Sequence, residues 1–509
     1  MIRLVLALVL ALVLMVGALS GGAAVQKVFI YHLAATPDIL DPAKCNNVRC
    51  QRVMWALYEP LVNLSKDLRK VVPGLAESWE VSADGLTYTF HLRKGVTFHD
   101  GSRFDAAAAK LNLERNFLPG SRFYTTTPPN VREKILTGLI NEITVRDEST
   151  LTVVLKNRKM NLLFLVPMVS PEALAKYGSK VGEHPAGTGP FRFVRSGADE
   201  IRLAANPAYW GGRPRLDELS FRIIPQAEKM SQEFMSGRLD FLPDVEPLYI
   251  ERIVANPHTK LIRLPTLSLY YLGLRTDRKP FNDPRVRQAL TRAIDVDRAV
   301  LFILRGTGIP AYGPLPPEAE AYEGTIKRVG YQPDAARRLL ADAGITNNLR
   351  VSLVFNEWEH FAELAQAMRA DLAKIGVTVD LIPTTSWKEL VDEVRKGRGD
   401  MFMYSWLIPL ADADAWLTPL FQSKSADNLT QYVSATVDRL LEQAKSTVND
   451  GQRLELYRKA QRVIVDDAPM VFLFHKVRVS AYNTRIVGLE LNTQSYPMDR
   501  FARTDLRTD

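Results

Sequence analysis

Cysteine is scarce in this 509-residue chain, which contains only Cys45 and Cys50. Metal binding by these thiols would need further ligands nearby in the sequence, and there are none. Two cysteines this close together can form a disulfide in an oxidising compartment, and such a bond would shape a small loop. Two free, buried thiols are the alternative.

Long runs of positive charge are also lacking. Lys and Arg together number 65 against 57 for Asp and Glu, and the net charge of +8 is spread along the chain. Nucleic-acid binding is therefore not predicted, because it needs a basic arm or stripe. The composition is that of an ordinary folded protein, and the length suggests about two to four domains.

Sequence motifs of enzymes are absent as well. The chain has no Walker loop, no GxGxxG, no HExxH and no GxSxG. Its seven histidines are scattered without the spacing of metal ligands: His32, His91, His99, His184, His258, His360 and His475. We therefore expect a protein that is not an enzyme and has neither a cofactor nor a metal site.

The N-terminal segment has the pattern of a signal peptide. Arg3 precedes an apolar run from Leu4 to Ala18, which is shorter than the ~20 residues that span a bilayer. Small residues follow, and we expect residues 1–24 to be removed by cleavage after Ala24. The alternative is an uncleaved membrane anchor. No later segment is long and apolar enough to cross a membrane, so we expect a soluble protein outside the cytoplasm.

Local patterns indicate a mixed α/β protein. Residues 87–92 alternate between two turns and predict a strand, and Asp105 is a candidate N-cap for a helix over 105–117. A second helix is predicted over 54–62. Strands and helices alternate over residues 349–405, which is typical of a parallel sheet covered by helices.

Several blocks, in this order and spacing, resemble the extracellular solute-binding proteins of peptide/nickel-type ABC importers, which form family 5. The blocks that carry the resemblance are Tyr58–Val62, Pro73–Trp79, Asp84–Val96, Phe98–Gly101, Gly187–Phe191, Asn206–Trp210, Tyr271–Leu274 and Asp283–Leu290.

The resemblance implies a two-lobed periplasmic binding protein fold of type II, of α/β class, with a ligand cleft between the lobes. Lobe I would comprise residues 25–266 and 478–509, with an inserted subdomain at about 62–180. Lobe II would comprise residues 267–477. The hinge would lie where the chain crosses between the lobes, near residues 267–271 and 474–479.

The same resemblance places three segments at the cleft. The first contains Asn46, Asn47 and Val48. In peptide-binding relatives, the corresponding loop pairs with the ligand backbone like an added strand. Because Cys45 and Cys50 bracket it, we hypothesise that their disulfide shapes this loop before ligand binds. A bracing turn remote from the ligand is the alternative.

The other two segments follow predicted strands of lobe II, where open α/β sheets present binding loops. Trp358 would form an apolar wall or else belong to the core, and Trp406 would stack on the ligand. Asp412 or Asp414 would accept hydrogen bonds from the ligand, or else cap a helix that starts near Ala415. The expected contact residues of lobe II are Asn356, Trp358, Tyr404, Ser405, Trp406, Asp412 and Asp414.

One departure from the family pattern concerns the solute. Dipeptide-binding relatives carry an aspartate for the peptide ammonium three residues after the position of Trp406, and this chain has Pro409 there. Proline offers neither charge nor an N–H donor. Either Asp412 substitutes, or the solute is not a peptide with a free N-terminus.

The function implied is capture of a peptide or similar solute by hinge closure and its delivery to an ABC permease, by a protein expected to be a monomer. The alternatives are a non-peptide solute (an oligosaccharide, an opine, a glutathione-like compound or a chelated metal), a ligand-bound sensor, and a secreted hydrolase that uses Asp412, Asp414 or a histidine. Nickel or haem has no support in the sequence, because His360 is the only histidine in an expected cleft segment.

Overall fold

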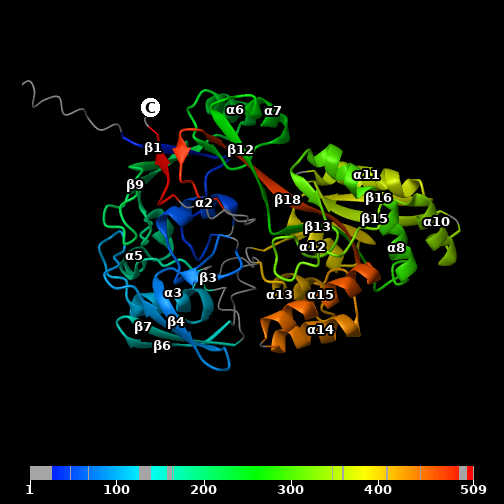
Figure 1. The fold of residues 1–509 in the computed structure, drawn as a ribbon, viewed down its shortest axis with the longest axis horizontal. Coiled ribbons are helices and arrows are strands. Elements are labelled where there is room, and N and C mark those ends of the chain that lie inside the picture. The colour runs from blue at the N-terminus through cyan, green and yellow to red at the C-terminus, as the bar shows by residue number, and fades with distance from the viewer. Residues whose placement is uncertain are drawn as a thin grey trace, which may run out of the picture.

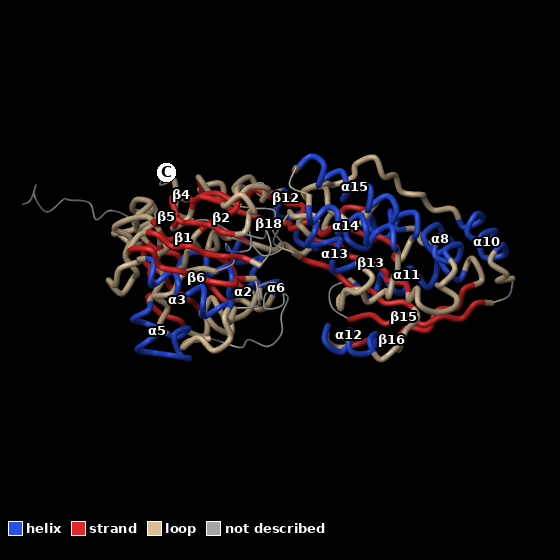
Figure 2. Tube along the Cα trace, turned by 90° about the horizontal axis from the view of Figure 1, so that it is seen from below, coloured by secondary structure: helices blue, strands red, loops and turns tan. Residues whose placement is uncertain are grey.

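The computed structural model describes residues 26–45, 47–66, 68–124, 139–156, 163, 166–346, 348–357, 360–408, 411–447, 449–491 and 501–507. The expected signal peptide, residues 1–24, lies outside this part of the chain. The described residues form two lobes side by side, with β12 and β18 passing between them (Figures 1 and 2).

The first lobe is built around five strands in the order β11-β1-β10-β9-β8. Alternate residues of β1, namely Phe29, Tyr31 and Leu33, are fully buried in its core. The chain returns here at its C-terminal end, where Phe501 packs on Phe29 with ring centroids 5.6 Å apart. The strands are β1 (Val28–Leu33), β8 (Phe191–Ser196), β9 (Glu200–Ala205), β10 (Glu218–Ile223), β11 (Phe241–Leu242), β19 (Ile486–Val487) and β20 (Asp505–Leu506). The helices are α2 (Val48–Leu57), α5 (Pro171–Tyr177), η2 (Gly178–Glu183), α6 (Ala227–Met235), η3 (Pro247–Tyr249) and α7 (Ile250–Val254).

A separate antiparallel sheet is inserted between β1 and β8, in the order β4-β5-β7-β6. Helix α3 lies against it, and Asp105 caps this helix by accepting a hydrogen bond from the backbone N–H of Ala108. A short hairpin, β2–β3, precedes the sheet. The elements are β2 (Val62–Leu64), β3 (Val71–Pro73), β4 (Ala76–Val81), β5 (Thr87–Leu92), α3 (Ala106–Phe117), β6 (Ile140–Asp147) and β7 (Thr150–Leu155).

The second lobe has a sheet in the order β16-β15-β17-β13-β18, to which β14 adds along β18. Strands β15, β16 and β17 are parallel, as the alternation of strands and helices predicts. The strands are β13 (Ser268–Leu274), β14 (Gly308–Pro310), β15 (Leu349–Asn356), β16 (Val377–Thr384), β17 (Met401–Leu407) and β18 (Met470–Asn483).

Helices cover both faces of this second sheet. Helices α8, α10 and α11 pack on one apolar face, and α12 to α15 pack on the other. These elements are α8 (Pro284–Ala293), α9 (Val296–Ala299), η4 (Val300–Leu304), α10 (Pro333–Asp342), α11 (Phe361–Ala373), α12 (Trp387–Arg395), α13 (Asp414–Phe421), α14 (Ala435–Ser446) and α15 (Asp450–Asp467).

The long strand β18 belongs to both lobes. Its first residues pair with β13, and its last seven pair with β12 (Thr259–Pro265). Strand β12 leads through Thr266 and Leu267 into β13. The chain therefore passes between the lobes at Thr266–Leu267 and again within β18.

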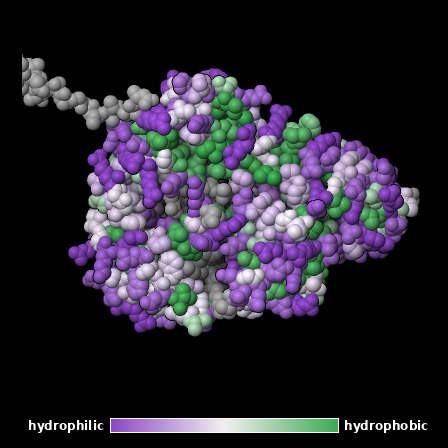
Figure 3. All heavy atoms as spheres, in the orientation of Figure 1, coloured by the Kyte–Doolittle hydropathy of each residue, from purple (hydrophilic) through white to green (hydrophobic). Residues whose placement is uncertain are grey.

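Figure 3 shows that mainly hydrophilic side chains cover the face of the molecule seen in Figure 1. An apolar patch lies near α7 and β12, where Leu248 and Val254 are exposed. No helix among the described residues has the length and apolarity needed to cross a membrane.

Candidate functional site

The carboxyl ends of the first lobe's strands point toward the second lobe. Strands β1 and β10 are parallel and end at Leu33 and Ile223. Strand β11 runs the same way and is antiparallel to β18, with Leu242 opposite Ala481. Because β18 begins in the second lobe, the ends of β1, β10 and β11 face that lobe.

The carboxyl ends of the parallel strands in the second lobe face the first lobe. These strands are β15, β16 and β17, which end at Asn356, Thr384 and Leu407. Leu407 lies opposite Ser268, the first residue of β13 after the crossing. Two carboxyl edges therefore face each other across the crossing strands, and the carboxyl edge of an open α/β sheet is where ligands bind.

A buried hydrogen-bond network holds the two crossings together. His475 of β18 contacts the carbonyl oxygen of Ser268 through Nδ1 at 2.7 Å, and the Lys476 N–H donates to the Ser268 hydroxyl at 2.9 Å. The Thr266 hydroxyl donates to the carbonyl oxygen of Lys476. Burial lowers the pKa of His475 to about 4, so its imidazole is neutral at pH 7.

A charged group lies at the carboxyl edge of the first lobe. Arg52 of α2 is buried and pairs with the exposed Asp244, which follows β11, at 2.5 Å. Desolvation raises the pKa of Asp244, but the charge and hydrogen bond of Arg52, together with the charges of Lys476 and Arg478, outweigh it, so the net shift of the pKa is downward. No local pattern in the sequence indicates this pair, because the two residues lie 192 positions apart.

The segment before α2 is firmly anchored. Asp41 is fully buried and pairs with Arg115 of α3 at 2.5 Å, and the Tyr58 hydroxyl donates to the carbonyl oxygen of Leu40. Cys45 and Cys50 are buried and form a disulfide, with Cα atoms 5.9 Å apart.

Asn47 and Val48 begin α2. The Asn47 side chain caps the helix by accepting from the N–H of Cys50 at 3.1 Å, and it donates to Asp38 at 2.9 Å. Val48 is the first helical residue and is half-buried. Contact of these residues with a solute stays a prediction.

The expected residues of β17 lie beside the crossing. Tyr404 and Trp406 share one face of the strand, whereas Ser405 is on the other face and is buried. The Tyr404 ring contacts Trp387 edge-on, with centroids 5.3 Å apart. Trp406 is half-buried, and its Nε1–H donates to the carbonyl oxygen of Ala415 at 3.1 Å.

Asn356, Asp412 and Asp414 take part in hydrogen bonds within the second lobe. Asn356 is buried and donates to the carbonyl oxygen of Thr384 at 3.3 Å. Asp412 precedes α13 by two residues and accepts from the N–H of Asp414 at 3.0 Å, whereas Ala413 occupies the N-cap position of the helix. Asp414 in turn accepts from Thr418 at 2.6 Å. Asn46, Trp358 and Pro409 lie outside the described residues.

Away from the crossings, the inserted subdomain approaches the second lobe. One continuous apolar cluster contains residues of both, including Leu64 and Leu68 of the β2–β3 hairpin and Leu315 and Ala319 of the second lobe. Burial raises the pKa of Glu318, and the charge of Arg69 opposes this shift. The interlobe region is therefore bounded by the crossing strands and by this contact.

A model of the bacterial extracellular solute-binding proteins, family 5 (Middle), matches residues 70–428. The chain belongs to family 5 of the extracellular solute-binding proteins. The glutathione-binding protein GsiB of Pectobacterium atrosepticum is 32% identical over 475 residues, which cover 90% of each chain. The dipeptide-binding protein of Escherichia coli is 29% identical over 504 residues, which cover 92% of this chain and 94% of that protein.

This family 5 protein also has the fold of its family. The solved structure of HbpA2 from Haemophilus parasuis superposes with a TM-score of 0.87 at 25% identity, covering 94% of this chain and 100% of that one. The expected two-lobed type II fold is confirmed. The protein is the solute-binding component of an ABC importer. Within the described residues, no three His, Cys, Asp or Glu side chains gather in a group that suits a metal ion.

Proposed function

We propose that this family 5 protein captures a peptide or peptide-like solute in the periplasm and hands it to a membrane permease. The observation that carries the proposal is the pair of carboxyl edges that face each other across two crossing strands. The glutathione-binding and dipeptide-binding relatives support a peptide-like solute. Export would end with cleavage after Ala24, and the mature protein would act as a monomer.

The mechanism is closure of one lobe on the other. Lobe I would comprise residues 25–266 and 478–509, with the inserted subdomain at about 62–180, and lobe II residues 267–477. The crossings at Thr266–Leu267 and within β18 would be the hinge. Closure would bury the solute between the lobes without altering it, and only the closed form would dock on the permease.

Tyr404 and Trp406 are the proposed apolar wall of this site. They lie on β17, which ends at the crossing, and both are half-buried. A solute can therefore cover the part of each aromatic side chain that is exposed. Asn46, Asn47, Val48, Asn356, Trp358, Ser405, Asp412 and Asp414 remain proposed contact residues.

The first test is native mass spectrometry of the freshly purified mature protein, followed by X-ray scattering with reduced glutathione and with dialanine. We expect one of these solutes, or the co-purified one, to reduce the radius of gyration. Binding without compaction would contradict hinge closure.

The second test is W406A, which removes the indole beside the crossing. We expect the dissociation constant of the solute found in the first test to rise by about tenfold or more, since aromatic contacts of this kind contribute on the order of 1 kcal/mol beyond the area they bury. W79A is the matched control, because Trp79 is half-buried on β4 of the subdomain. Equal effects of both variants would contradict the proposed site.

A further inference from the structure

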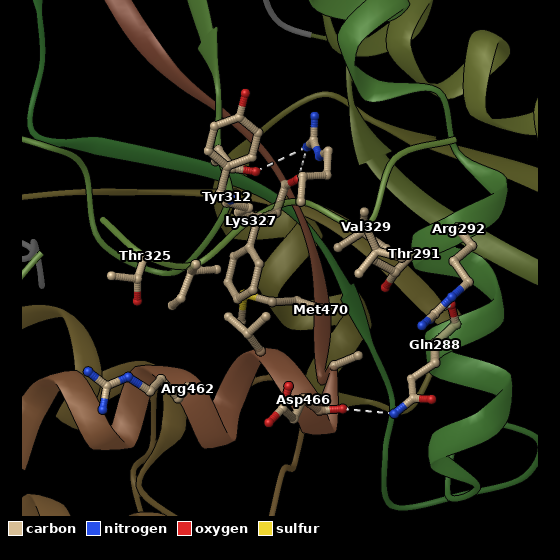
Figure 4. Close-up of a pocket in the computed structure, with 17 residues that line it drawn as sticks. Gln288, Thr291, Arg292, Tyr312, Thr325, Lys327, Val329, Arg462, Asp466 and Met470 are labelled. Atoms are coloured by element: carbon tan, nitrogen blue, oxygen red, sulfur yellow. Dashed lines mark hydrogen bonds between the residues drawn. The ribbon is translucent and has the colours of Figure 1, made fainter. Parts of the chain in front are cut away.

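The second lobe contains a cavity that the proposed transport function does not use. Its volume is about 380 Å³, within the range of small-molecule sites. Figure 4 shows Gln288, Thr291 and Arg292 of α8 on one side, Arg462 and Asp466 of α15 on another, and Met470 of β18 between them.

The cavity forms because an edge of β18 is left open. Strand β14 pairs with Phe474, His475 and Lys476, so residues 470–472 extend beyond it. The segment 325–329 covers this stretch, and Arg328 donates to the carbonyl oxygen of Phe472 at 2.8 Å. Helix α8 comes from one face of the sheet and α15 from the other. The space between these two helices and the strand edge is the cavity.

This cavity is distant from the interlobe region. Met470 pairs with Gly273 of β13, whereas Ser268 marks the crossing end of the same strand. Five residues of extended chain separate the two positions, which is about 16 Å at ~3.3 Å per residue. Neither Tyr404 nor Trp406 lines the cavity.

The floor and the rim of the cavity differ in chemistry. Buried Met470 and Phe472, with Val465 and Ile326, supply apolar surface. The rim carries four cationic side chains and one carboxylate: Arg292, Lys327, Arg328, Arg462 and Asp466.

Two of the four cations are already neutralised. Arg328 pairs with Asp297 at 2.7 Å, and Arg462 pairs with Glu323. Within the part of the chain that the structure describes, Arg292 and Lys327 form no ion pair, and the only partner of the Arg292 guanidinium is the carbonyl oxygen of Gln288. Set against Asp466, these two cations leave the rim with one excess positive charge.

We infer that this cavity is a second ligand site, which takes a small organic monoanion with an apolar body and one carboxylate. The apolar body lies on Met470 and Phe472, and the carboxylate accepts a charge-assisted hydrogen bond from Arg292 or Lys327. An uncharged molecule leaves both cations without a counter-charge and binds less tightly. A dianion exceeds the charge that the rim can balance.

The probe is phenylacetate, titrated into the mature protein by isothermal calorimetry, with phenylacetamide as its uncharged counterpart. We expect phenylacetate to bind, and phenylacetamide to bind about tenfold or more weakly. Undetectable phenylacetate binding at millimolar concentration, or equal binding of the two compounds, would overturn the inference.

Three variants locate the site. The double variant R292Q/K327Q should weaken phenylacetate binding about tenfold or more, whereas K229Q, at an exposed lysine of α6, should leave it unchanged. T291F adds bulk to the cavity wall without changing its charge, and this variant should abolish phenylacetate binding. Loss of phenylacetate binding in W406A, or full binding in both cavity variants, would place the probe elsewhere and overturn the inference.

Discussion

At the scale of single residues, the ion pair between Asp41 and Arg115 connects the segment before α2 to the inserted subdomain. Both side chains are almost completely buried, so removal of one leaves an uncompensated charge. We expect R115M to lower the free energy of unfolding by about 3–5 kcal/mol in urea denaturation. K388A, which breaks the exposed ion pair with Asp392, should change the free energy of unfolding little. Similar losses in both variants would contradict the role assigned to burial.

The buried imidazole of His475 makes stability depend on pH. Its pKa is about 4 in the folded protein and about 6.5 when unfolded, so the unfolded chain binds more protons between these values. The contribution of neutral His475 to the free energy of unfolding is complete above pH 6.5. It is lost as the pH falls toward 4, by up to about 3 kcal/mol. H475Q should flatten the decline of the unfolding free energy between pH 7 and 4.5. H258Q, at an exposed ring, should keep the wild-type decline.

At the scale of elements, the disulfide between Cys45 and Cys50 fixes the turn into α2. The closed loop is short, so the chain-entropy model gives only about 2 kcal/mol of stabilisation. We expect C45S/C50S to fold, to unfold at slightly lower urea concentration, and to bind the solute less tightly, because the loop must then be ordered on binding. Unchanged affinity, measured by calorimetry beside wild type, would favour a bracing turn remote from the solute.

Elements with purely local signals were predictable from the sequence. The alternation over residues 87–92 matches β5, and Asp105 caps α3 as its position before four alanines indicates. The helix expected over 54–62 was wrong in its bounds, because Asn47 caps α2 and starts it at Val48, and the chain is already extended at Tyr58.

The positions of candidate-site residues were predictable only where they depend on residues that are close together in the sequence. Asp414 is the first residue of α13 and Asp412 lies just before it, and these positions follow from residues a few places apart. Arg52 and Asp244 pair across 192 positions, so no local pattern indicates their contact. Part of the Pro-rich segment 306–324 pairs with β18 as β14, and this pairing depends on the folded edge of that strand, so no local pattern indicates it.

At the scale of the whole molecule, the contact between the inserted subdomain and the second lobe bears on the balance between open and closed forms. Burial raises the pKa of Glu318 in this contact, so the ionised carboxylate disfavours the arrangement and Arg69 partly offsets that cost. We expect separation of the lobes at the proposed hinge to return Glu318 to water. Protonation of Glu318 therefore favours closure, and loss of Arg69 favours opening.

Two variants at this contact should move the closed population in opposite directions. E318Q mimics the protonated carboxyl group, so without ligand at pH 7 it should reduce the radius of gyration relative to wild type. R69Q removes the compensating charge and should increase it. Lowering the pH toward 5 should compact wild type and R69Q but leave E318Q unchanged, because E318Q has no carboxylate to protonate. Shifts in the same direction for both variants, measured by X-ray scattering, would show that this contact does not control closure.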